Sequence, residues 1–165
     1  MRFIVGRAAK DKDDGRGHRV HKRRQQREHA MTRIAVAYIT TAIIFAALDF
    51  LWLSKMGSAL YRPIIGEIMA AEPRMAPAVI FYLIFIAGLV YFAVLPGLAA
   101  GSWQVALVKG AALGFVAYAT YDLTNQATLS VWSSKITLFD LAWGTFVSGV
   151  GAASGCALTR LIVKG

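Results

Sequence analysis

The sequence is poor in the residues that build reactive centres. It has a single cysteine, Cys156, so an intramolecular disulfide and the CxxC patterns of metal and redox sites are excluded. Its histidines, His18, His21 and His29, all precede the first long apolar segment. The sequence has no P-loop and no GxSxG nucleophile motif. We therefore predict no cofactor, no metal and no catalytic residue, and an enzyme is the less favoured class.

Charged residues are also scarce, and the basic ones are unevenly placed. Only 16% of the 165 residues are charged and 57% are hydrophobic, which is too apolar for an ordinary soluble domain. The net charge of +9 would suggest a nucleic-acid partner if it were spread over a fold. However, eleven of the 18 Lys and Arg lie within residues 1–33. The basic character belongs to a tail, and we expect no nucleic-acid partner.

Residues 1–33 show no apolar periodicity, which predicts a disordered segment or a frayed helix. The favoured interpretation is a cytoplasmic topology signal, because positive charge beside a first span orients it. A specific role with anionic lipid or nucleic acid is one alternative. Another is an upstream extension of a protein that starts at Met31.

Four later segments are apolar enough to cross a bilayer, which takes about 20 helical residues. Backbone groups in lipid must be satisfied within the segment, so these are helices and not strands. We predict an all-α fold: an integral membrane four-helix bundle over residues 34–163 that follows a basic tail. The predicted spans are 34–53, 75–95 (stopped by Pro96-Gly97), 104–126 and 138–158.

The remaining charges predict the orientation. If the tail is cytoplasmic, then Lys109, Arg160 and Lys164 join it on that side. The opposite side receives four basic residues, which are Lys55, Arg62, Arg74 and Lys135. This asymmetry favours both termini in the cytoplasm. In the first outer loop, Arg62-Pro63 and the apolar residues after it predict a short interfacial helix.

Small residues recur every fourth position on the last two predicted spans, a pattern that lets helices approach closely. The first seam is Ala106, Gly110 and Gly114, and the second is Gly144, Ser148 and Ala152. Packing within one chain is the favoured interpretation. The alternative is a homo-oligomer that forms through Gly110, Gly114, Gly144 and Ser148. The lipid bilayer is a predicted partner in either case.

Three aspartates fall near the outer ends of the predicted spans. The first and third spans run outward and the fourth runs inward, so Asp49, Asp122 and Asp140 share one layer. Charged side chains inside spans are costly and usually face protein or water. Thr137 to Asp140 has the form of a capping box, which gives Asp140 a structural interpretation. Asp49 and Asp122 lie near helix C-terminal ends, where the dipole disfavours negative charge, so a proton- or cation-handling role competes with simple hydrogen bonding.

Asp122 has the more polar surroundings. Tyr118, four residues before it, and Asn125, three residues after it, share its helix face. Phenol, carboxylate and amide groups are suited to lining a small polar pocket for a head group or a cation. The candidate binding residues are Asp49, Asp122, Tyr118, Asn125 and Asp140.

Several motifs resemble the DUF2177 family of bacterial predicted membrane proteins. They are MTRIAVAYI, LDFLWL around Asp49, Tyr61-Arg62, FYLIFIAGLVYFAV, AYATYDLTNQATL around Asp122, and DLAWGT from Asp140. The resemblance covers Met31 to about Leu161 and leaves the tail outside. It implies an architecture and no activity.

Three functions remain open. The first is handling of a small solute or a cation, alone or coupled to protons, through the aspartates, Tyr118 and Asn125. The second is a membrane scaffold or subunit in which the same acids only fasten helices together. A lipid-modifying enzyme is the third and least favoured.

Overall fold

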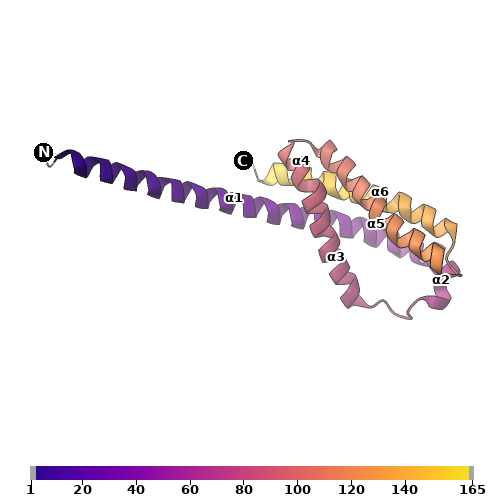
Figure 1. Ribbon diagram of the computed structural model, residues 1–165. Coiled ribbons are helices and arrows are strands. Elements are labelled where there is room, and N and C mark those ends of the chain that lie inside the picture. The colour runs from indigo at the N-terminus through magenta and orange to yellow at the C-terminus, as the bar shows by residue number, and fades with distance from the viewer. Residues whose placement is uncertain (1–2, 164–165) are drawn as a thin grey trace. The chain divides into compact units, whose positions relative to one another are not determined.

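The computed structural model describes residues 3–163, with side chains from residue 21 onward. The described part of the chain consists of helices and loops and contains no strand, which confirms the predicted all-helical class. The elements are α1 (Phe3–Met56), η1 (Gly57–Tyr61), α2 (Arg62–Ile65), η2 (Gly66–Ile68), α3 (Met75–Leu89), η3 (Val90–Val94), α4 (Leu95–Ala99), α5 (Trp103–Thr128) and α6 (Ser134–Ile162) (Figure 1).

The chain divides into two units, Met1–Ala35 and Val36–Gly165. In the first unit the described residues are helical, where the sequence predicts disorder or a frayed helix. Residues 1 and 2 of that tail lie outside the described residues. Residues 22–31 consist mostly of good helix formers, and Arg24 Nε lies 3.0 Å from Glu28 Oε1 one turn later. Residues 21–35 are all exposed.

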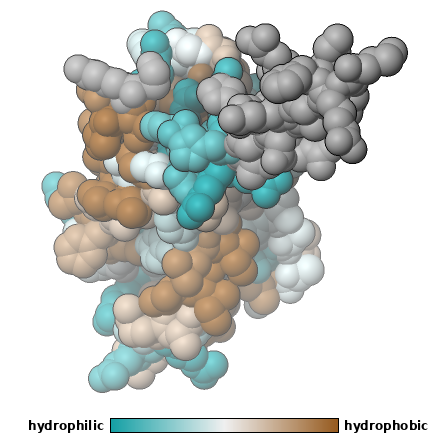
Figure 2. Space-filling view, turned by 90° about the vertical axis from the view of Figure 1, so that its left-hand side faces the viewer, coloured by the Kyte–Doolittle hydropathy of each residue, from teal (hydrophilic) through white to brown (hydrophobic). Residues whose placement is uncertain are grey.

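Three helical segments among the described residues are long and apolar enough to cross a membrane: His21–Ile68, Met75–Ala99 and Ser134–Ile162. They coincide with three of the four predicted spans. α5 covers the remaining prediction, but its polar residues place it below the same apolar level. Hydrophobic side chains cover broad areas of the surface, as expected of a protein that meets lipid (Figure 2).

The sequence predicts that the second span stops at Pro96-Gly97, but the structure shows that it does not. The helix continues from α3 through η3 and α4 to Ala99. η3 is a π-helical turn in which the Leu95 N–H bonds the Val90 carbonyl, five residues back. A proline removes one backbone donor and crowds the preceding turn. The wider π turn just before Pro96 accommodates this, so the helix carries on.

α5 and α6 are antiparallel neighbours in close contact (Figure 1). A β-carbon on Gly110 would lie 2.7 Å from the Ser148 carbonyl oxygen, and one on Gly114 would overlap both Gly144 and Ser148. The predicted small-residue seams therefore face each other within one chain, as the favoured interpretation requires. The structure gives no evidence that the same residues join two copies of the chain.

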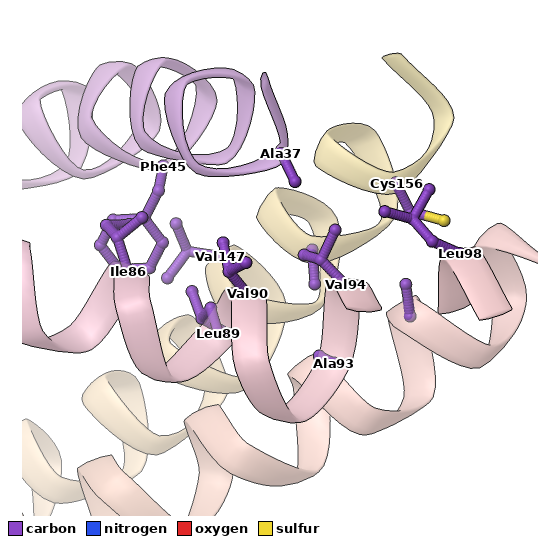
Figure 3. Packing of buried hydrophobic residues seen from close by; sticks show 12 residues of the cluster. Ala37, Phe45, Ile86, Leu89, Val90, Ala93, Val94, Leu98, Val147 and Cys156 are labelled. Atoms are coloured by element: carbon purple, nitrogen blue, oxygen red, sulfur yellow. The ribbon is translucent and has the colours of Figure 1, made fainter. Parts of the chain in front are cut away.

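A second contact region joins α1, the α3–η3 segment and α6. Phe45 of α1 is fully buried, with its ring centroid 5.3 Å from that of Phe85. It also packs on Gly151 of α6, and Figure 3 shows it beside Ile86. This apolar layer ends one turn beyond Phe45, where Asp49 begins the polar region of the molecule.

Candidate functional site

Asp49 is buried near the end of the apolar part of α1, at 6% exposure. Both of its carboxylate oxygens accept hydrogen bonds from aromatic side chains of other helices. Trp143 Nε1 of α6 donates to Oδ1 at 3.0 Å, and the Tyr82 phenol of α3 donates to Oδ2 at 2.5 Å. Asp49 therefore fastens α1 to both α3 and α6.

Asp140 is not a helix cap, contrary to the prediction from its sequence context. α6 begins at Ser134, and the cap is Ser133, whose side chain accepts a hydrogen bond from the Ile136 N–H. Asp140 follows in the second turn of α6 and is 6% exposed. The capping prediction failed because α6 starts one turn earlier than the apolar pattern suggests. Asp140 thereby becomes a full member of the acidic site.

An aromatic network holds Asp140 and connects it to Asp49. The Tyr61 phenol, at the end of η1, donates to Asp140 Oδ1 at 2.5 Å and accepts from Trp52 Nε1 at 2.9 Å. The Trp52 indole stacks on the Trp143 indole, with centroids 4.5 Å apart and planes 7° apart. Because Trp143 donates to Asp49, the two acids belong to one connected set of donors and rings.

Asp122 is the exception in this site. Its side chain has no exposed area, and within the described residues neither carboxylate oxygen has a hydrogen-bond partner. Across the interface it interacts with Asp140, a second carboxyl group that can hydrogen-bond to it only when one of the two is protonated. A buried polar group without a partner is unusual and costs free energy.

The register of α5 against α6 explains why the two acids face each other. Gly114 lies against Ser148, and one turn later the Tyr118 ring lies directly over Gly144. In antiparallel helices, one further turn brings Asp122 to Asp140. The small-residue seam thus places two carboxyl groups opposite each other at the end near the α5–α6 turn.

Tyr118 lies between the acids. Its half-buried phenol interacts electrostatically with Asp49, Asp140 and Asp122. Asn125, the other predicted lining residue, is half-buried and lies beside the Tyr121 phenol. We define the acid cluster as Asp49, Asp122 and Asp140 together with Tyr118, and Asn125 lies at its edge.

Polar side chains beside the cluster fix the ends of the two helices. Gln126 Nε2 donates to Ser134 Oγ at 2.9 Å, and Gln126 Oε1 accepts from Thr137 Oγ1 at 2.7 Å. Trp132 Nε1 donates to the same Thr137 hydroxyl at 3.2 Å. These bonds hold the α5–α6 turn in the register that brings Asp122 to Asp140.

The acid cluster is not arranged as a multidentate metal site. Among the described residues, no three His, Cys, Asp or Glu side chains gather where they would hold one metal ion. Two of the three acids already accept hydrogen bonds from indole or phenol donors. The chemistry that remains is that of carboxyl groups, phenols and indoles.

One family model matches the chain, over residues 34–157, and its description is "Predicted membrane protein (DUF2177)". The match covers most of the chain and includes all three acids. The chain belongs to the DUF2177 family. No curated protein and no solved structure matches it significantly.

For this DUF2177 protein, sequence reasoning missed the donors that hold the acids. Tyr61, Tyr82 and Trp143 all lie in the motifs that resemble the family, but none of them was predicted to hold an acid. A signal was available, because each lies near the same predicted outer layer as the acids. Indole and phenol groups buried at that level need polar partners, and carboxylates are the acceptors available there.

Proposed function

We propose that this DUF2177 protein binds and transfers a proton or a small cation through the acid cluster. The observation that carries the proposal is the full burial of Asp122, opposite a second acid and without a hydrogen-bond donor among the described residues. Ionisable groups inside membrane helices are expensive, and they commonly mark ion and proton pathways. A purely structural acid would be expected to have donors, as Asp49 has.

The absence of a basic neighbour supports this proposal. The ionisable groups that act on Asp122 and Asp140 among the described residues are acids and phenols. A buried carboxylate is usually neutralised by a paired cation or by protonation. Since the chain supplies no cation here, the neutralising charge has to come from outside as a proton or a small cation.

The proposal includes α5 as a fourth span. Its 26 residues give a length of about 39 Å at 1.5 Å per residue, enough to cross the apolar core of a bilayer. Its small-residue face is buried on α6, and Asp122 faces the interior. α5 carries several polar residues among its apolar ones, but Asp122, the charged residue of its later half, is shielded from lipid.

We further propose that the protein lies in a bacterial inner membrane with both termini cytoplasmic and the acid cluster near the outer face. The segment Arg62–Ile68, which carries the short helix α2 and η2, would lie in the outer interface. The support is the uneven distribution of Lys and Arg. The test is to fuse to each terminus a reporter that is active on only one side of the membrane. An externally located C-terminus would overturn this orientation.

The experiment that tests the function is a flux measurement. Purified protein in proteoliposomes with a pH-sensitive dye inside should dissipate an imposed proton gradient, and a matched assay should use a Na⁺ or K⁺ gradient. Asp122→Asn keeps the shape of the side chain and removes its titration, so flux should fall at least about tenfold, in line with the loss of a proton-transfer group. Glu67→Gln, an exposed acid in the loop, is the matched control and should leave flux unchanged.

The alternative is a membrane scaffold or subunit without transport or catalysis. Asp49 favours it, because this acid has both oxygens bound and joins three helices. If Asp122→Asn folds and its flux equals that of the wild type, the transfer proposal fails and the scaffold interpretation gains.

A further inference from the structure

We propose that Asp122 and Asp140 act as a pair that holds one exchangeable proton between them, while Asp49 is a positioning residue outside the pair. This inference rests on the proposed function and assigns its residues. It departs from the ranking that the sequence suggests, in which Asp49 and Asp122 titrate and Asp140 caps a helix.

The first argument is the position of the two carboxyl groups. The α5–α6 seam fixes them opposite each other, and Gly114 and Gly144 keep the two backbones too close for the helices to rotate apart. Two carboxylates that face each other in a buried place repel strongly when both are ionised, and a single proton between them relieves the repulsion.

The second argument is the distribution of donors. The Tyr61 phenol binds Asp140 Oδ1, which leaves Oδ2 as the oxygen that is available to share a proton with Asp122. Asp122 has no donor among the described residues, so a proton on Asp140, or its own proton directed at Asp140, would satisfy it. Asp49, in contrast, receives one donor on each oxygen and accepts both bonds best as a carboxylate.

The third argument is the set of titratable groups around the pair. Tyr118 and Tyr121 of α5 and Tyr61 of η1 act on it as phenols, and Asp49 of α1 acts on Asp140 as an acid. Tyr82 of α3 is bound to Asp49 instead. A single proton is the smallest species that relieves the repulsion within the pair, to which it leaves one negative charge, and it fits between two buried side chains.

The proton balance of one exchange is simple. A proton that arrives from water forms an O–H bond on one of the two carboxyl groups, and that O–H group donates to the facing carboxylate. On release the same O–H bond breaks and the proton returns to water. The pair then carries two negative charges and favours immediate reloading.

The test is infrared spectroscopy of purified protein over a pH titration, which follows the C=O stretch of protonated carboxyl groups. Above about pH 6, where exposed acids are ionised, the wild type should show one such titrating band. The band should be lost in Asp122→Asn and equally lost in Asp140→Asn, because each amide N–H replaces the shared proton and leaves the other acid ionised. Asp49→Asn should retain the band.

A second variant covers the case in which an asparagine variant does not fold. Asp140→Glu keeps a carboxyl group at this position, so the band should remain but shift in frequency. Persistence of an unchanged band in Asp140→Asn or in Asp140→Glu would show that Asp122 holds its proton alone and would overturn the pair. Loss of the band in Asp49→Asn alone, or its absence from the wild type at every pH, would overturn it as well.

The flux assay separates this inference from the proposed function. The infrared band can be lost in both asparagine variants while Asp122→Asn still transports normally. In that case the pair holds a proton that takes no part in transport, and the proposed function fails. If flux depends on Asp122 but not on Asp140, the function stands and the pair is wrong.

Discussion

The α5–α6 interface contains two regions that the same helix register creates. One region is closely packed, and the other contains a polar group without a hydrogen-bond donor in the described part of the chain. Along the seam, each small residue fills its space against the facing helix, as Gly110 does against Ser148 and Ala152. At the end near the α5–α6 turn the same alignment sets Asp122 against Asp140, and Asp122 receives no hydrogen-bond donor among the described residues. The seam is packed for stability, whereas the acid end keeps an unsatisfied group. Proteins tolerate such a conflict mainly where function requires it.

The largest expected effect comes from breaking the seam. In Gly114→Ala the new methyl group meets the Gly144 carbonyl oxygen, which cannot rotate away. We expect a loss of about 3 kcal/mol or more in the free energy of unfolding, at the upper end of what overpacking a core costs. The measurement is thermal or SDS-induced unfolding of the purified protein.

The matched control is Gly88→Ala on α3, where a β-carbon would meet nothing within 4 Å. Alanine favours helix over glycine, so this variant should be neutral or more stable by up to about 1 kcal/mol. Equal effects of the two substitutions would show that the α5–α6 contact does not govern stability.

An intermediate effect on stability is expected at Asp49, the acid whose two oxygens both accept hydrogen bonds. Tyr82→Phe removes the donor to Asp49 Oδ2 and should lower the free energy of unfolding by about 2 kcal/mol, the range for hydrogen bonds to charged groups. Tyr91→Phe serves as control, because Tyr91 is 66% exposed and its ring contacts Phe92. If Tyr82→Phe is as stable as the control, the hydrogen bond from Tyr82 to Asp49 does not stabilise the contact between α1 and α3.

The smallest effect on stability is expected at Asp122. Asp122→Asn breaks no hydrogen bond among the described residues and lets an amide N–H approach Asp140. The unfolding free energy should be unchanged or higher by up to about 1 kcal/mol, the usual sign when a group kept for function is removed. A marked loss of stability would make Asp122 a structural residue and remove the contrast with the seam.

The sequence by itself determined what depends on local composition. Apolar runs long enough to cross a bilayer fixed the helical membrane class, and the glycine spacing predicted where helices approach. The motifs around Asp49, Asp122 and Asp140 predicted the family. The three acids were also found from sequence, because charge inside an apolar helix is conspicuous.

Only the tertiary structure decided which groups meet. That Asp122 faces Asp140, that Tyr82 and Trp143 hold Asp49, and that Tyr61 holds Asp140 depend on the register between helices far apart in the chain. Helix ends also depended on context, since a π turn carries the helix past Pro96 and Ser133 starts α6 one turn before the apolar pattern begins. Helix formation is a local property, whereas the partner of a side chain is fixed by how whole helices pack, and no local pattern contains that information.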